Sequence, residues 1–281
     1  MSETTRGMER TLLLNDGNRI PRLGFGVFQV KDPASCRRAV REAVDAGFRH
    51  IDTAWVYGNE EAVGDAIAEC GVPRADIFLT TKADFDLSPD KIRRTFEASL
   101  KKLRTDYVDL FLIHWPFGDD LAPAWSVLEE LKARGRCRSI GVSNFTVARF
   151  EKAFFPRAKS VPAVNQVELH VYNQQRALVD YCRGKGMAIE AYSVLTRGAR
   201  LASAAPALAA VAAETGRTAA QVMIRWVLQK GIVALVKSAT PERIRENAAA
   251  LDFELAADQM RRLDALEAGI VVQDWFPKGY Y

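Results

Sequence analysis

Four side chains in this sequence could together protonate a carbonyl group as a hydride donor reduces it: Asp52, Tyr57, Lys82 and His114. Transfer of a hydride to a carbonyl carbon leaves an alkoxide, which needs a proton. A phenol can donate that proton although its reference pKa is about 10, and a nearby ammonium lowers this pKa because it favours the phenolate. We therefore predict Tyr57 as the acid, Lys82 as the group that tunes it and Asp52 as the carboxylate that holds the lysine. A neutral His114 would orient the carbonyl oxygen.

Each of these residues also has a simpler interpretation when it is taken alone. Asp52 is a typical cap for a helix that follows it, and Tyr57 could belong to an ordinary loop. A lone histidine such as His114 is more often a buried residue with satisfied hydrogen bonds than a catalytic group. Lys82 is the hardest to explain in this way, because a lysine directly after an apolar run is unusual unless its charge is paired.

The elements that must position these residues are short apolar runs, typical of buried parallel strands. We expect eight strands, at Leu23–Gly26, Phe48–Ile51, Ile77–Thr81, Tyr107–Ile113, Ser139–Val142, Ala163–Val167, Met187–Ala191 and Ile232–Val236. Polar side chains stand at the ends of seven of them: Asp52-Thr53, Lys82, His114, Ser143-Asn144, Gln166 with Glu168, Tyr192-Ser193 and Lys237-Ser238. In a closed barrel the carboxyl ends of parallel strands meet at one rim, where barrel active sites lie.

Amphipathic stretches separate the strands and predict helices. They lie at Ser35–Ala46, Ser88–Leu103, Trp125–Ala133, Val147–Phe155, Gln174–Cys182, Ala219–Leu228 and Pro241–Leu251. Two further helices are expected outside the repeat, at Pro206–Glu214 and Leu255–Leu266. Glycines stand where helices should end: Gly47, Gly71, Gly135, Gly184 and Gly231. Before the first strand, 11–14 and 19–22 flank an Asn-Asp-Gly-Asn turn and predict a hairpin.

This order predicts an α/β fold, a (β/α)₈ TIM barrel with an N-terminal β-hairpin and two extra helices. The alternative is a doubly wound sheet. Its phosphate-binding fingerprint fails, because Gln29 follows Gly24 and Gly26 where a third glycine belongs. We expect one domain over residues 1–281, with a flexible segment at 1–10 and a C-terminal tail at 269–281 on the substrate side.

Composition narrows the classes of partner. The net charge of +4 is small and dispersed, so nucleic acid is not expected. Four cysteines without a CxxC pair and three isolated histidines give no disulfide framework and no metal site. No uncharged run is long enough for a membrane span and the first ten residues carry no apolar signal core. We expect a cytoplasmic enzyme, a monomer, that acts on a small molecule.

The motifs of this chain resemble those of the aldo-keto reductases over nearly its whole length. They are Asp52-Thr53-Ala54 with Tyr57-Gly58-Asn59-Glu60, Leu112-Ile113-His114-Trp115-Pro116, Ile140-Gly141-Val142-Ser143-Asn144-Phe145, Asn165-Gln166-Val167-Glu168, and Lys237-Ser238 followed by Pro241-Glu242-Arg243-Ile244 and Glu246-Asn247. Together they are highly specific. The family's catalytic tetrad falls on Asp52, Tyr57, Lys82 and His114. The short loop between Pro116 and Trp125 resembles the bacterial 2,5-diketo-D-gluconate reductase and methylglyoxal reductase branch.

The resemblance implies a site for NADPH (NADP⁺). Ser143, Asn144 and Gln166 would bind the carboxamide, Tyr192 would stack on the nicotinamide ring, and Ser193 and Leu195 would lie along the pyrophosphate. Lys237, Ser238 and Arg243 would bind the 2′-phosphate, with Glu246 and Asn247 near the adenine. The remaining implied contacts are Gly26, Val27 and Asp52. A simpler interpretation of Arg243 and Glu246 is a surface ion pair, which contributes little.

Substrate contacts are expected from Phe28, Trp55, His114, Trp115 and Trp275 in the tail. The tail is either an apolar wall of the pocket or a segment packed against the side of the barrel. Three positions depart from the family pattern. Val236 and Val194 stand where proline is common, which leaves the loop path over the cofactor open, and Phe28 replaces a frequent tryptophan.

Two other functions remain open at this point. One is a regulatory member of the same fold that keeps the nucleotide and turns over little substrate. The other is a phosphate-binding lyase or isomerase that uses Lys82 as a Schiff-base lysine, which leaves Lys237, Arg243 and Asn247 unexplained. The interpretation we favour is NADPH-dependent reduction of small aldehydes or ketones to alcohols by hydride transfer.

Overall fold

A computed structural model describes residues 10–201 and 205–273. Eight parallel strands close into a barrel in the order β10-β3-β4-β5-β6-β7-β8-β9. The strands are β3 (Leu23–Gly26), β4 (His50–Asp52), β5 (Phe78–Lys82), β6 (Val108–Ile113), β7 (Cys137–Ser143), β8 (Val164–Glu168), β9 (Ala188–Tyr192) and β10 (Val233–Val236). Each expected strand is present, and the closed order excludes the doubly wound sheet.

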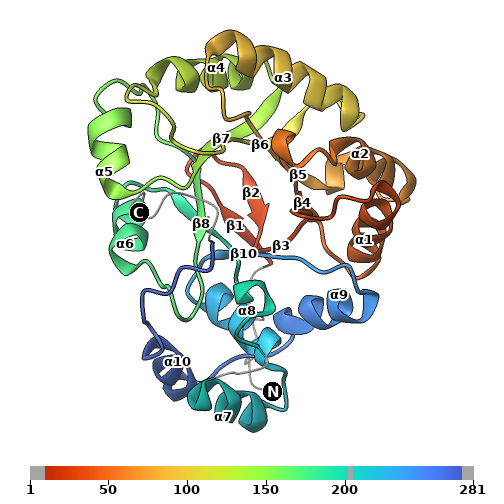
Figure 1. The fold of residues 1–281 in the computed structure, drawn as a ribbon, viewed down its shortest axis with the longest axis vertical. Helices are drawn as coiled ribbons and strands as arrows, with labels where there is room; N and C mark the ends of the chain where they lie inside the picture. The colour runs from red at the N-terminus through yellow and green to blue at the C-terminus, as the bar shows by residue number, and fades with distance from the viewer. Residues whose placement is uncertain (1–9, 202–204, 274–281) are drawn as a thin grey trace, which may run out of the picture.

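Helices surround the barrel (Figure 1). They are α1 (Pro33–Asp45), α2 (Glu60–Glu69), α3 (Pro89–Lys102), α4 (Ala122–Ala133), α5 (Val147–Arg149), α6 (Arg176–Gly184), α8 (Ala219–Gln229) and α9 (Pro241–Ala248). The two extra helices are α7 (Pro206–Thr215) and α10 (Ala257–Asp264), which lie together at one side of the ring. Short turns complete the chain: η1 (Trp55–Tyr57), η2 (Arg74–Asp76), η3 (Phe150–Phe154), η4 (Thr196–Gly198) and η5 (Ala249–Leu251).

The start of α1 shows how the sequence determines a helix here. Asp32 caps it by accepting the backbone N–H of Ser35 at 2.8 Å, and Pro33 occupies the first turn, where its missing N–H costs nothing. The face predicted from the sequence is the buried one: Cys36, Ala39, Val40, Ala43 and Val44. This apolar stripe packs the helix against the outside of the barrel.

The N-terminal hairpin, β1 (Thr11–Leu13) and β2 (Arg19–Pro21), covers the amino end of the barrel. Asn18 Nδ2 donates to the carbonyl of Arg138 at 3.1 Å, and Lys132 pairs with Asp16 at 2.7 Å. Ile20 is buried against residues of β5, β6, β8 and β10. With this end closed, the carboxyl ends of the strands are the open rim.

Two details of the predicted elements were wrong. Helix α2 was not among the predicted helices, because its buried positions are mostly small (Ala62, Val63, Ala66 and Ile67) and give a weak apolar pattern. Gly184 is the last residue of α6, as predicted, and Gly186, with a φ of 76°, takes the left-handed conformation two residues later. The stretch expected as one helix at 147–155 is the short α5 followed by the wide turn η3.

Segments 1–9 and 274–281 lie outside the described residues, and so do the flexible start expected there and most of the aromatic tail. Within the described ranges, no helix is long and apolar enough to cross a membrane.

Candidate active site

A buried ion pair lies at the rim. Asp52 is the last residue of β4 and Lys82 the last residue of β5, and these neighbouring parallel strands pair Asp52 with Thr80. Lys82 Nζ lies 2.7 Å from Asp52 Oδ1 and 2.8 Å from Oδ2, and it also donates to the carbonyl of Thr53 at 2.9 Å. The Lys82 side chain is 0% exposed. Asp52 is thus the partner of a buried lysine, as predicted, and not a helix cap.

Tyr57 ends the short turn η1 that follows β4. The loop is held by Thr53 and Asn59: Thr53 Oγ1 donates to Asn59 Oδ1 at 2.9 Å, and Asn59 Nδ2 donates to the carbonyls of Val27 and Val30. Gly58 follows with a φ of 70°, a left-handed conformation in which glycine carries no steric penalty. These contacts fix the turn so that the Tyr57 hydroxyl lies 3.5 Å from Lys82 Nζ.

Electrostatics at Tyr57 involve two opposed effects. Burial raises the pKa of Tyr57, and the nearby Lys82 ammonium lowers it, so the net pKa lies above its ordinary value. Lys82 therefore acts in the predicted direction, but burial outweighs it in the protein alone. Burial also disfavours the Lys82 ammonium, but Asp52 more than offsets this, so the pKa of Lys82 is raised. Lys82 stays a cation, and Tyr57 stays a protonated phenol.

His114 follows β6 and faces the same group of side chains. Burial, and then the Lys82 charge, hold the pKa of His114 well below its ordinary value, so the imidazole is neutral. Its ring centroid lies 5.6 Å from that of Tyr57 at an interplanar angle of 74°. Phe28 contacts Tyr57 from the other side, with ring centroids 4.9 Å apart, and Phe85 contacts His114 at 5.3 Å. The phenol thus sits between an aromatic wall and a neutral imidazole.

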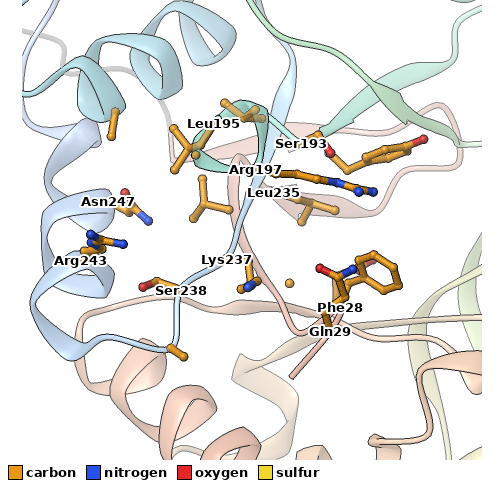
Figure 2. Close-up of a pocket in the computed structure, with 18 of the residues that line it drawn as sticks. Phe28, Gln29, Ser193, Leu195, Arg197, Leu235, Lys237, Ser238, Arg243 and Asn247 are labelled. Carbon is orange, nitrogen blue, oxygen red and sulfur yellow. The ribbon is translucent and has the colours of Figure 1, made fainter. Parts of the chain in front are cut away.

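A pocket of about 830 Å³ begins at these residues and continues along the rim to α9. Its walls come from the loops after β3, β9 and β10 (Figure 2). The ends of β7 and β8 also contribute, with Ser143, Asn144 and Gln166. The predicted site residues that line it are Gly26, Phe28, Asp52, Tyr57, His114, Trp115, Ser143, Asn144, Gln166, Tyr192, Ser193, Leu195, Lys237, Ser238, Arg243, Glu246 and Asn247. The fold thus brings these seventeen residues from distant parts of the sequence to one cavity.

Near the tetrad, four polar residues are joined by hydrogen bonds. Ser143 Oγ donates to the Gln166 carbonyl at 2.9 Å, and Asn144 Nδ2 donates to the His114 carbonyl at 3.0 Å. The Tyr192 hydroxyl lies 2.8 Å from Asn144 Oδ1. Gln166 Nε2 donates to Asp52 Oδ2 at 2.9 Å, which ties this group to the ion pair. The amide groups are therefore held in defined orientations.

The far end of the pocket carries cations on an exposed surface. Lys237 and Arg243 are exposed, whereas Ser238 and Asn247 are buried. Figure 2 places Arg243 and Asn247 on α9 at one side, across from Phe28, Ser193 and Arg197. An Arg243–Glu246 ion pair is not formed; instead the Thr218 hydroxyl donates to Glu246 Oε1 at 2.5 Å. The simpler ion-pair interpretation of this end is therefore wrong.

Two predicted contacts of the described residues are not at the pocket. Val27 is fully buried in the core, and its backbone N–H bonds to the Asp52 carbonyl. Trp55 lies at the start of η1, where the Lys102 ammonium sits 3.8 Å from the ring centroid. Trp275 lies outside the described residues. Val194, which stands where proline is common, is buried and lines the pocket.

Sequence reasoning missed several lining residues, of which Gln29 and Arg197 are the most polar. Both have a positive φ, of 64° and 53°, as do Asn144 and Ser193 at the same pocket. Residues other than glycine rarely adopt this backbone conformation, and those that do are frequent at functional sites. Backbone strain in loops leaves no pattern in the sequence, so no signal could have identified these two residues.

Comparison with known proteins agrees with this geometry. Residues 22–268 match the Aldo/keto reductase family. The chain belongs to this family. It is 42% identical over 260 residues to a glyoxal reductase of Bacillus subtilis, covering 92% of this chain and 93% of that protein. It is 41% identical over 273 residues to an uncharacterized oxidoreductase of the same organism, covering 95% and 96%.

A solved structure of an aldo/keto reductase from Brucella melitensis superposes with a TM-score of 0.87 at 43% identity, covering 92% of this chain and 99% of that one. The chain is therefore an aldo-keto reductase, an oxidoreductase with the TIM-barrel fold of its relatives, and its family membership supports carbonyl reduction.

Proposed function

We propose that this aldo-keto reductase reduces small aldehydes or ketones with NADPH and that Tyr57 donates the proton. The observation that carries the proposal is the position of the Tyr57 hydroxyl beside the buried Lys82–Asp52 pair, at one end of a pocket whose other end presents Lys237 and Arg243. One end has the groups for proton transfer, and the other has the charges for a phosphate.

The pocket suits a dinucleotide in the chemistry of its lining. Lys237 and Arg243 provide charge-assisted hydrogen bonds for a 2′-phosphate, and Ser193 and Leu195 line the same pocket (Figure 2). Ser143, Asn144 and Gln166 offer amide and hydroxyl partners for a carboxamide, and Tyr192 offers a ring to stack on it. When bound, the reduced nicotinamide supplies the hydride.

The side chains of the tetrad then transfer the proton. Tyr57 is protonated and lies next to Lys82, so it donates to the carbonyl oxygen, and the ammonium stabilises the phenolate that remains. Asp52 keeps the ammonium in place. His114 is neutral, so it orients the carbonyl oxygen through a hydrogen bond and does not serve as the acid.

A Schiff-base role for Lys82 is disfavoured by its contacts. An amine must lose its proton before it attacks a carbonyl, and a lysine nucleophile is activated by a lowered pKa. Here both oxygens of Asp52 and the Thr53 carbonyl accept from Nζ, and the pKa is raised. The lysine is held as an ammonium.

Small carbonyl compounds suit the enclosed reaction end. Trp115 and Phe28 line it, and Phe85 and Phe117 extend the same aromatic wall with ring centroids 5.7 Å apart. The relative named glyoxal reductase supports a reactive aldehyde as substrate. A monomeric state and a cytoplasmic location stay predictions from the sequence.

Tyr57→Phe is the decisive experiment. It keeps the ring and its packing against Phe28 and removes only the acid. We expect kcat for a reactive aldehyde to fall by ~10²–10⁴-fold, while NADPH affinity, measured by fluorescence titration, changes little. A variant with near-normal kcat would show that another group is the acid. An inactive wild-type protein that still binds NADPH would instead favour the regulatory function.

A further inference from the structure

A second buried carboxyl group lies below the catalytic ion pair, inside the barrel. Glu190 is in the middle of β9 and is fully buried. Gln166 Nε2 donates to Glu190 Oε2 at 2.6 Å and to Asp52 Oδ2 at 2.9 Å, so one amide nitrogen bridges the two carboxyl groups. The bridge connects β8 with β4 and β9 across the barrel interior, through residues 114 and 24 positions apart in sequence.

The charges of this cluster do not balance if both carboxyl groups are ionised. Lys82 contacts both oxygens of Asp52 and neutralises that carboxylate. Among the described residues, no lysine or arginine forms an ion pair with Glu190, whose partner at 3.5 Å is His50. An isolated carboxylate in a dry interior costs many kcal/mol, so such a group takes up a proton instead.

His50 is the other candidate for a cation that could balance the charge of Glu190, but its imidazole is neutral. Its Nε2 lies 3.5 Å from Glu190 Oε1 and 3.0 Å from the Thr80 hydroxyl. The ring is packed so closely that a side chain at Gly24 would come within 2.6 Å of Nδ1. Burial lowers the pKa of His50 to about 3, so the imidazole is neutral.

We propose that Glu190 is a positioning residue of the active site, which holds the Gln166 amide against Asp52 as a neutral carboxylic acid. The inference rests on the proposed function only in that Asp52, through Lys82, serves Tyr57. Glu190 itself contacts neither Tyr57 nor the reacting carbonyl.

The bridge fixes the orientation of the Gln166 amide. Both N–H groups of Nε2 are used by acceptors, Asp52 and Glu190, so the nitrogen must face the barrel interior and Oε1 the remaining space. Gln166 also lines the pocket. Loss of the Glu190 contact would free the amide to rotate, and Asp52 would lose a hydrogen bond that helps set the position of Lys82.

Among the titratable groups around Glu190, Asp52 favours a proton on it and Lys82 opposes one. From β4 come His50 and Asp52 and from β5 comes Lys82; the register neighbour on β10, Val233, is apolar. Burial, and then the Asp52 charge, raise the pKa of Glu190 well above its usual range, against smaller opposite effects of Gln166 and Lys82. Ionised Glu190 would raise the pKa of Tyr57 and make it a weaker acid.

Infrared spectroscopy tests the proton directly, without turnover. The difference spectrum between wild type and Glu190→Gln should contain the C=O stretching band of a protonated carboxyl group at neutral pH. Glu60→Gln is the matched control: Glu60 is a buried carboxyl that accepts from Thr81 and Ser99 and does not contact Gln166 or Asp52. The Glu190 band should persist in that variant. Its absence from the wild-type protein would overturn the neutral-acid assignment.

The pH dependence of stability gives an independent measurement. Because the folded pKa of Glu190 is raised, the unfolded chain loses its proton first as pH rises, and the wild type then loses unfolding free energy. Glu190→Gln has no proton to lose. The stability of this variant relative to the wild type should therefore grow from mildly acidic to alkaline pH, and a constant difference would contradict the proposal.

Kinetics separate positioning from structure. Glu190→Gln keeps an oxygen that accepts from Gln166, so it should retain most of the wild-type kcat, whereas Glu190→Leu should lower kcat by ~10-fold to ~100-fold through misplacement of the tetrad. Equal kcat values for the two variants, with a difference only in melting temperature, would reduce Glu190 to a structural residue. If Tyr57→Phe is inactive in the same assay, that outcome would leave the proposed function intact.

Discussion

At one end of the pocket Lys82 and Asp52 are buried and held by short hydrogen bonds, whereas at the other end Lys237 and Arg243 are exposed. The side chains at the buried end lose little conformational freedom when the substrate binds, because they are already in position. The exposed end must order flexible side chains around a ligand and is screened by water and salt. The same ionic chemistry should therefore matter for rate at the first end and for affinity at the second.

The largest effect is expected from breaking the buried pair. Lys82→Met leaves the Asp52 carboxylate buried without its cation and leaves Tyr57 without its nearest positive charge. We expect kcat to fall by at least ~100-fold and the free energy of unfolding to fall by about 3–5 kcal/mol. Stopped-flow or steady-state NADPH oxidation measures the first, and denaturant unfolding the second.

A double variant tells the two losses apart. Lys82→Met with Asp52→Asn removes both charges, so it should recover part of the stability and none of the activity. Lys230→Met is the control, since Lys230 pairs with Asp264 at 2.7 Å but is partly exposed and away from the pocket. If activity returned with stability in the double variant, Lys82 would be a structural residue only.

The exposed end should respond in affinity and not in rate. Arg243→Ala removes one charge-assisted contact to a 2′-phosphate, and since the side chain is exposed we expect the NADPH dissociation constant to rise by only ~10-fold. NADH lacks that phosphate, so its affinity should hardly change. Binding titrations with both cofactors at two salt concentrations test this.

Arg245→Ala is the matched control on the same helix, because Arg245 is exposed and pairs with Glu42 and Glu242 outside the pocket. Equal losses for NADPH and NADH in Arg243→Ala would remove the phosphate assignment and, with it, the contrast between the two ends.

The buried end was also the more predictable from sequence. Lys82 and His114 stand out because such residues rarely end apolar runs, and the parallel barrel brings strand ends together wherever they lie in the chain. Several strands end one residue later than predicted. Asp52, Lys82 and Tyr192 are polar but still belong to the hydrogen-bonded ladder.

What escaped prediction depends on partners that are remote or on backbone geometry. Glu190 is one acidic residue within an apolar run, and its role is visible only when Gln166 and Asp52 arrive from other strands. Gln29 and Arg197 reach the pocket through left-handed loop residues. Composition and periodicity carry neither kind of information.

The smallest effect is expected from the contact that holds the C-terminal tail beside the buried end of the pocket. The Glu168 carboxylate, at the end of β8, accepts the backbone N–H groups of Val272 at 2.7 Å and Gln273 at 3.0 Å. Gln273 Oε1 in turn lies 2.5 Å from the Tyr192 hydroxyl. The described part of the tail is thus tied to the rim beside the tetrad, which favours its predicted place on the substrate side.

Glu168→Gln replaces one of the two accepting oxygens with a donor, so one backbone N–H of the tail loses its partner. A single hydrogen bond contributes about 0.5–1.5 kcal/mol, so ratios of kcat/KM across a panel of aldehydes should shift by ~2-fold to ~10-fold, while NADPH affinity stays constant. Amide exchange at Val272 and Gln273 should quicken. Glu130→Gln, an ion-paired carboxylate on α4, controls for the chemical change. Faster exchange with unchanged kcat/KM ratios would mean that the tail is anchored here but does not shape the substrate pocket, and unchanged exchange would mean that Glu168 is not its anchor.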